Sequence, residues 1–221
     1  FNRPHPNALP TRPGQALNIE PIWFEWLALG GLLLFGSWLL GMRGVWALLL
    51  SSDPTGITLV IIVVFFASTL WCGARSRELQ RQRQLLQSAS GEGWAAEYLA
   101  ALRARPVDDN APLDLLVEMA QAPHHTAWWV NGIQLKLGLL GKVIGFSVLA
   151  LQIGNIQSFD ASQSQDLLKS LTQGLGIALL TTMVGLVGNI LLGLQLTRLD
   201  RYADTLVADC QRAGLNIGRN A

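Results

Sequence analysis

The chain has 221 residues, of which 50% are hydrophobic and 14% are charged, with a net charge of +1. A typical soluble domain carries about a quarter charged residues, so the composition argues against a soluble protein, and the lack of a basic stripe argues against a nucleic-acid partner. The charges are gathered in blocks between long apolar stretches, which predicts an all-α integral membrane protein with four transmembrane helices.

The first half of the chain is expected to hold two of these helices, within residues 20–73. Before them, residues 1–19 are rich in proline and lack an apolar core, so they are expected to form an arm rather than a signal sequence. The first span is predicted over Ile22–Gly41 and the second over Thr55–Gly73, each about the 20 residues that cross a bilayer. The partly apolar residues 42–54 between them either extend the first helix or lie along the membrane surface.

The second half is expected to return to the membrane within residues 132–199, with a third span over Ile133–Ile153 and a fourth over about Asp166–Leu199. Residues 74–131 are charged and carry apolar residues at helical spacing, which predicts a helical cytoplasmic domain between spans two and three. Residues 200–221 are expected to continue the fourth helix as a cytoplasmic C-terminal helix and tail. An apolar stripe there is expected to pack on the 74–131 helices: Leu199, Tyr202, Leu206 and Cys210.

The placement of arginine predicts the orientation, because cytoplasmic loops carry an excess of basic residues. Arginines are concentrated in residues 74–131 and after Leu196, whereas the loop 154–165 has none. Both termini are therefore expected in the cytoplasm, as in a multi-pass protein of a bacterial or archaeal inner membrane. Arg43, in the first outer loop, departs from this pattern.

Catalytic chemistry is not expected, because the sequence shows no nucleophile–base pair and no phosphate-binding loop. The histidines and cysteines lack metal-ligand spacing, so neither a metal nor a cofactor is expected. His124 and His125 are interpreted as surface residues, and Cys72 and Cys210 as small apolar fillers.

Spans three and four differ from the first two in their small and polar residues. Small residues at helical spacing let membrane helices approach closely, so a helix-packing role is expected for Gly138, Gly141, Gly145, Gly174, Ala178 and Gly185. Polar side chains inside a span usually mark function. They are expected to face an axis lined by spans three and four, while spans one and two face lipid. The candidate ion-pathway residues are Lys142, Gln152, Thr181, Thr182 and Asn189.

Lys142 is the unusual member of this set, because a charge inside the bilayer is costly. If the span begins at Ile133, the lysine lies roughly 13 Å deep at a rise of 1.5 Å per residue. If it begins at Leu137, the depth is about 8 Å, and a lysine side chain reaches the interface from there. A snorkelling role and a pore-facing role both remain open.

Two segments of spans three and four carry a resemblance. "LGLLGKVIG" at residues 137–145 resembles the "GLLGTVxG" segment of the MotA/TolQ/ExbB proton-channel family, and "GLGIALLTTMVGL" at 174–186 resembles that family's "GIAxALxxTxxGL" segment. The resemblance covers about Ala127–Arg201, and the four spans are similar to the MotA arrangement. It implies a homopentamer in the lipid bilayer around a single-span partner of the ExbD/TolR/MotB kind, which carries an ion-binding aspartate. Such an assembly converts proton motive force to mechanical work.

The family's pore threonine corresponds to Thr182, whereas Lys142 stands where relatives commonly have another threonine. Those two threonines are thought to help coordinate sodium in family members that use it. A fixed cation beside a pore repels Na⁺, so a pore-facing Lys142 predicts that the chain does not conduct sodium. The alternative is a non-conducting membrane scaffold of the same fold.

Overall fold

The computed structural model describes residues 22–52, 55–88, 91–104, 110–154 and 161–218, and every regular element within them is a helix. The predicted arm over residues 1–19 lies outside the described part of the chain. The six helices are α1 (Ile22–Met42), α2 (Val45–Ser52), α3 (Ile57–Ser88), α4 (Trp94–Ala104), α5 (Ala111–Gly154) and α6 (Ala161–Gly218).

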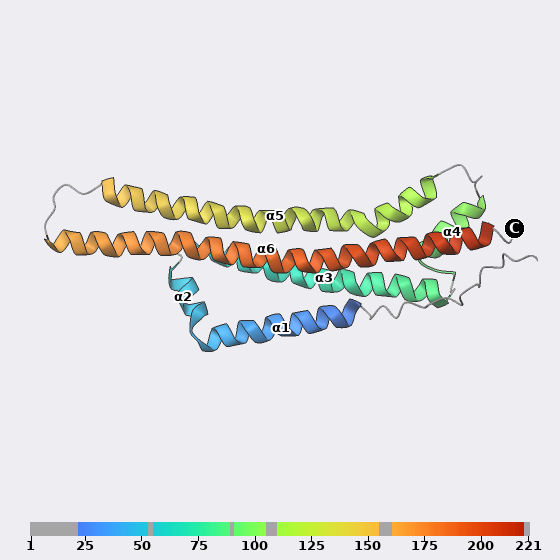
Figure 1. Cartoon of the computed structure of the whole chain (residues 1–221), viewed down its shortest axis with the longest axis horizontal. Helices are drawn as coiled ribbons and strands as arrows, with labels where there is room; N and C mark the ends of the chain where they lie inside the picture. The colour runs from blue at the N-terminus through green and yellow to red at the C-terminus, as the bar shows by residue number, and fades with distance from the viewer. Residues whose placement is uncertain (1–21, 53–54, 89–90, 105–109, 155–160, 219–221) are drawn as a thin grey trace, which may run out of the picture.

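The two longest helices, α5 and α6, run antiparallel and side by side, and they form the backbone of the molecule (Figure 1). Helix α3 packs along α6 and also contacts α5, while α1 lies on the outer side of α3. Helix α4 sits at the end of the bundle where α6 finishes. The bundle thus has one end formed by α4 and the end of α6, and an opposite end where α5 ends and α6 begins.

Four helices are long and apolar enough to cross a membrane, namely α1 and stretches of α3, α5 and α6. This confirms the predicted all-α fold with four candidate spans. Three of the helices are much longer than a span: the 58 residues of α6 correspond to about 87 Å at 1.5 Å per residue, against a bilayer core of about 30 Å. Each long helix therefore continues well beyond its apolar stretch.

The segment between the first two spans forms a separate short helix. Helix α1 ends at Met42, and Gly44 adopts a positive φ of 70° in the turn that follows. Glycine tolerates this left-handed conformation because it has no Cβ. The amide of Gly44 donates to the carbonyl of Gly41 over 3.0 Å, which closes the turn. Of the two alternatives for residues 42–54, an extended first helix is therefore wrong.

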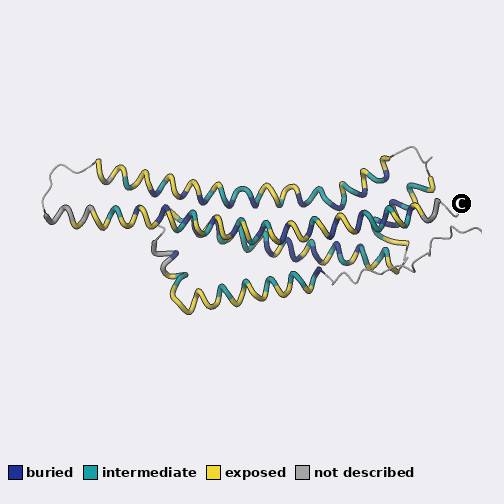
Figure 2. Tube along the Cα trace, in the orientation of Figure 1, coloured by how far each residue is buried: buried dark blue, intermediate teal, exposed yellow. Residues whose placement is uncertain are grey.

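The principal core lies at the α4 end of the bundle, where burial is most continuous along α6 (Figure 2). The predicted stripe of Leu199, Tyr202, Leu206 and Cys210 is buried there against Leu79 of α3, Tyr98 of α4 and Leu116 of α5. This confirms that the last part of the chain continues α6 and packs on the preceding helices. Both cysteines are free and buried.

Helix α1 is held mainly at its first turn. The ring of Trp23 stacks on that of Trp26 with centroids 5.0 Å apart, and the guanidinium of Arg77 lies 3.8 Å from the Trp23 ring centroid. Glu25 accepts a hydrogen bond from Arg198 of α6 over 2.9 Å. The rest of α1 is largely exposed. Helix α3, by contrast, buries Thr58, Ile61 and Thr69 against its neighbours, so only part of the second span is free to face lipid.

Candidate functional site

The small residues of α5 and α6 lie directly against one another. A Cβ placed on Gly145 would lie 2.9 Å from the backbone nitrogen of Ala178 and from the carbonyl oxygen of Gly174. A Cβ on Gly138 would lie 3.3 Å from the Cα of Gly185. Real Cβ atoms do not tolerate contacts under 3.0 Å, so glycine is what allows the two backbones to approach this closely.

Thr181 is the most enclosed of the predicted pathway residues. Its side chain is fully buried, and its hydroxyl donates to the carbonyl of Ile177 in its own helix over 2.9 Å. A Cβ on Gly141 would lie only 2.5 Å from the Thr181 hydroxyl oxygen. The side chain of Thr181 thus occupies the space that a side chain at position 141 would need. Its hydroxyl has its hydrogen-bond partner within its own helix.

Thr182 lies at the edge of the same contact and is half-buried. Its hydroxyl donates to the carbonyl of Ala178 over 2.7 Å and also approaches the carbonyl of Gly138 in α5 at 3.3 Å. Because a hydroxyl has a single proton, the shorter contact is the main hydrogen bond. The oxygen therefore keeps acceptor capacity on a surface that is only partly covered.

Lys142 lies at the level of this threonine. On either side of it in the sequence, Gly141 lies against Thr181 and Gly145 lies against Ala178. The backbone of Lys142 is therefore at the same height along the bundle as the Ala178–Thr182 turn of α6. The lysine is exposed, and it forms no ion pair with any described residue. Gln152, the other polar residue predicted on α5, has a side chain outside the described part of the chain.

Asn189 joins α6 to α5 nearer the α4 end. Its side-chain amide donates to the carbonyl of Asn131 over 2.9 Å. The structure thus places Asn189 in a cross-helix contact, one helical turn below Gly185.

A row of buried polar side chains near Asn189 was missed by sequence reasoning. It consists of Gln134, Asn131 and Gln195, which are at most 4% exposed, and Thr69, which is 7% exposed. The amide of Gln195 donates to the Thr69 hydroxyl over 3.3 Å. Both side-chain polar atoms of Gln134, as well as Oδ1 of Asn131 and Oε1 of Gln195, have no partner among the described residues. Gln134 faces a glycine of α6, since a Cβ on Gly188 would lie 2.9 Å from Gln134 Oε1. The sequence carries no signal for this pairing, because it depends on the register of α5 on α6.

Helix α5 contains Pro123, and Figure 1 shows the helix bending toward its N-terminal end. Proline has no N–H, so the carbonyl four residues earlier, that of Met119, loses its helical partner. Arg75 of α3 supplies the replacement: one guanidinium nitrogen donates to Met119 over 2.8 Å and to the carbonyl of Ala120 over 3.0 Å. The cation of Arg75 also lies 5.2 Å from the ring centroid of Trp94 in α4.

His124 is buried beside this arginine, so its interpretation as a surface residue was wrong, whereas His125 is exposed. Nδ1 of His124 lies 2.7 Å from a carboxylate oxygen of Asp200, and Nε2 accepts a hydrogen bond from Arg75 Nε over 3.4 Å. These partners define a neutral imidazole with its proton on Nδ1. The second carboxylate oxygen of Asp200 accepts from Trp128 over 2.8 Å.

The environment of His124 favours this neutral form. The residue precedes the predicted third span, and burial lowers its pKa below the ordinary 6.5, with a further lowering by the charge of Arg75. The hydrogen bond to Asp200 and the charge of that carboxylate act in the opposite direction and do not cancel the effect of burial. Protonation would replace the acceptor at Nε2 with a donor that faces Arg75.

These groups do not form a metal centre, since no three His, Cys, Asp or Glu side chains in the described ranges gather as ligands. Three polar features are the candidates for a functional role: the Lys142–Thr182 level, the row around Gln134, and the cluster of Arg75, His124 and Asp200. Comparison of the chain with family models, curated proteins and solved structures finds no match.

Proposed function

We propose that the chain is the membrane subunit of an ion-driven energy-coupling complex, a homopentamer around a single-span partner that carries an ion-binding aspartate. The proposal rests on the resemblance of residues 137–145 and 174–186 to the MotA/TolQ/ExbB family. One observation supports it best: these two segments pack against each other, with Lys142 at the level of Thr182. The work would be delivered across the inner membrane, with both termini in the cytoplasm.

In this proposal the path runs along the face of the α5–α6 pair that carries Lys142 and Thr182. Thr182 keeps acceptor capacity beyond its own hydrogen bond to Ala178. Lys142 contributes three donors and a positive charge, which repels Na⁺ and pairs readily with a partner aspartate. Protons are therefore the expected driving ion. Thr181 contributes to the packing of the pair, because its hydroxyl bonds to its own helix.

The alternative is a non-conducting scaffold of the same fold, and Lys142 is the observation that favours it. A lysine with no described acidic neighbour would form a firm ion pair with the aspartate of the partner. Such a pair would hold the two components in one position instead of releasing them at each step.

The deciding experiment measures ion flux. The chain would be purified from its own membrane with any associated single-span protein, reconstituted in vesicles, and tested under separate proton and sodium gradients. We expect proton flux in the wild type, its loss in Thr182→Val, and sodium flux after Lys142→Thr. Thr197→Val is the matched control, because Thr197 is exposed on α6 and makes the same type of bond to its own helix, 2.8 Å to Gly193.

The possible results distinguish the channel subunit from the non-conducting scaffold. Sodium-dependent flux in the wild type would contradict the role given to Lys142. An assembly that contains the partner but passes neither ion, and gains flux only after Lys142→Thr, would establish the scaffold. Purification without any single-span partner would count against both.

A further inference from the structure

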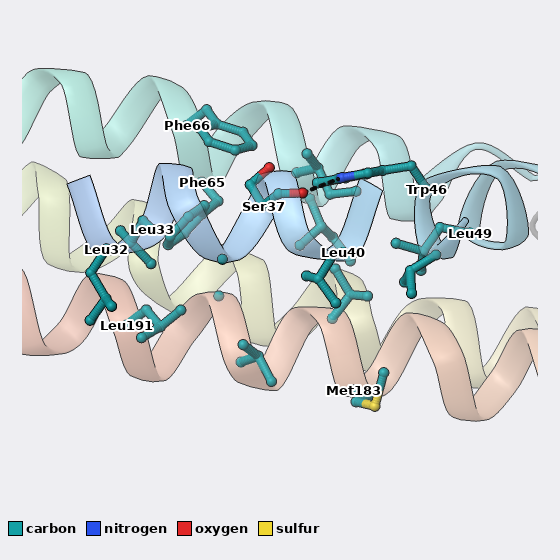
Figure 3. A pocket seen from close by; sticks show the side chains of 17 residues that line it. Leu32, Leu33, Ser37, Leu40, Trp46, Leu49, Phe65, Phe66, Met183 and Leu191 are labelled. Atoms are coloured by element: carbon teal, nitrogen blue, oxygen red, sulfur yellow. Dashed lines mark hydrogen bonds between the residues drawn. The ribbon is translucent and has the colours of Figure 1, made fainter. Parts of the chain in front are cut away.

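An apolar groove lies between α1, α2, α3 and α6 (Figure 3). Its volume is about 410 Å³. Side chains from all four helices line it, among them Leu32 and Leu40 of α1, Trp46 of α2, Phe66 of α3, and Met183 and Leu191 of α6.

The groove offers almost nothing to a polar ligand. Apart from Ser37 and Trp46, every described lining residue is apolar. The indole N–H of Trp46 already donates to the backbone carbonyl of Ser37 over 2.9 Å, as the dashed line in Figure 3 shows. A polar occupant would lose its hydration without gaining partners, whereas a hydrocarbon would gain contacts and lose nothing.

The position of the groove fits one hydrocarbon in particular. It extends along α1 from Leu40 to Leu32, which is about 12 Å at 1.5 Å per residue. The α1–α2 turn follows Leu40 at one end of this stretch, and α2 contributes Trp46 to the lining. Tryptophan is enriched at membrane interfaces. The groove thus runs from the interface toward the bilayer centre, as a lipid tail does.

A basic residue, Arg43, belongs to the turn at this end of the groove. Arg43 lies in the α1–α2 turn, between Leu40 and Val45 of the lining, and it is exposed and without an ion pair to any described residue. It is also the arginine that departs from the charge pattern of the other loops. A guanidinium at headgroup level favours a phosphate, and each basic residue near a membrane surface strengthens binding of anionic lipid.

We propose that this groove binds one acyl chain of an anionic phospholipid, with the lipid phosphate held at Arg43. The bound tail fills the space between α1 and α6, where no side chain of the two helices does so. The lipid fixes α1, which is otherwise attached chiefly at its first turn through Trp23 and Glu25. The inference requires that the four helices lie in a membrane and does not require ion conduction.

Gly36 provides a sharp test, because it lines the groove and a Cβ placed on it meets nothing within 4 Å. The Cβ of Gly36→Leu therefore meets free space, and the rest of the leucine side chain is expected to enter the groove. Gly31→Leu is the matched control: Gly31 lies on the same helix, also has no neighbour within 4 Å, and is not part of the lining.

The measurement is native mass spectrometry of the purified chain after incubation with equal amounts of phosphatidylglycerol and phosphatidylcholine. The wild type and Gly31→Leu are expected to retain one phosphatidylglycerol. Gly36→Leu is expected to retain about tenfold less, since the leucine displaces two or more buried methylene groups. Arg43→Gln is expected to keep a lipid and to lower the preference for the anionic headgroup about fivefold.

The proposal is overturned if Gly36→Leu retains lipid as the wild type does, or if Gly31→Leu loses it equally. It is also overturned if the wild type retains no lipid and Gly36→Leu instead dissociates an oligomer, which would assign the groove to a second copy of the chain. An unchanged headgroup preference in Arg43→Gln would overturn the role of that arginine. If Gly36→Leu does not fold by circular dichroism, Leu40→Trp at the exposed rim of the groove replaces it, with the same expected loss.

Discussion

At the scale of single residues, several hydrogen bonds converge on the site where Pro123 lies inside α5. Because proline has no N–H, the carbonyl of Met119 lacks its helical donor, and Arg75 donates a hydrogen bond to it instead. The same arginine also donates to His124. His124 in turn is hydrogen-bonded to Asp200, so a continuous series of side-chain hydrogen bonds links α3, α5 and α6. A buried polar network of this kind is stabilising only while every member has its partner. The protonation state of His124 therefore bears on the whole junction.

We predict that stability falls as the pH drops below about 6.5 because of His124. Well above pH 6.5 the imidazole is neutral in both the folded and the unfolded chain. Below it, the unfolded chain binds a proton that the folded chain accepts only at its lowered pKa, so the free energy of unfolding decreases and then levels off. The loss is about 1.4 kcal/mol for each pH unit between the two pKa values.

Thermal unfolding in detergent at several pH values checks this. His124→Asn keeps a donor for Asp200 but cannot titrate. Its unfolding midpoint should therefore be lower than that of the wild type at pH 7.5 and should change little as the pH falls below 6.5. His125→Asn, at the exposed neighbouring position, should retain the pH slope of the wild type. An equal slope in His124→Asn would assign the effect to other groups.

At the scale of elements, the α5–α6 pair is organised by glycines that differ in what surrounds them. Gly138, Gly141 and Gly145 each face α6 at contact distance, whereas a Cβ on Gly132 of the same helix meets nothing within 4 Å. Glycine in a helix is entropically unfavourable. Its presence at the three facing positions is explained by close approach of the backbones, and at Gly132 nothing in the structure explains it.

Gly145→Ala is predicted to destabilise the pair, because its methyl group would press on the backbone of Gly174 and Ala178 at 2.9 Å. Overpacking of this kind costs about 1–3 kcal/mol. Gly132→Ala should be neutral or stabilising by about 0.4–1 kcal/mol, since it only restricts the unfolded chain. Unfolding of both variants in mixed micelles measures the difference, and a Gly145→Ala variant as stable as Gly132→Ala would contradict the close packing.

The sequence predicted the helices well where hydrophobic pattern decides them. The four apolar stretches and the stripe from Leu199 to Cys210 follow directly from composition and helical spacing. Helix α2 was left open because residues 42–54 are apolar enough for either path, and only the positive φ of Gly44 ends α1. The bend of α5 was not predicted, since the residues around Pro123 do not tell which distant arginine replaces the lost hydrogen bond.

At the scale of the whole molecule, long-range pairing was beyond the sequence. Lys142 and Thr182 could be singled out from their residue types, and their common level followed only from the register of α5 on α6. His124, Gln134 and Gln195 were missed as buried groups, because a polar residue near a span has the same pattern whether it faces solvent or another helix. Burial of this kind depends on which helices become neighbours.

The orientation of the bundle gives a prediction at this scale. The structure places the α1–α2 turn and helix α4 toward opposite ends of the bundle (Figure 1), and the arginine pattern predicts that the α4 end lies in the cytoplasm. Single cysteines introduced at Met42, at Glu92 and at Leu215, which are all exposed, should therefore differ in access. We expect a membrane-impermeant maleimide to label Met42→Cys in intact spheroplasts, and Glu92→Cys and Leu215→Cys only after lysis.

The native thiols make a clean background for this test, because Cys72 and Cys210 are at most 1% exposed. The unmodified chain should remain unlabelled on both sides until it is denatured. Labelling of Glu92→Cys in intact spheroplasts together with protection of Met42→Cys would invert the orientation. It would then place Arg43 and the neighbouring end of the proposed lipid groove in the cytoplasmic leaflet, where basic residues commonly bind anionic lipids.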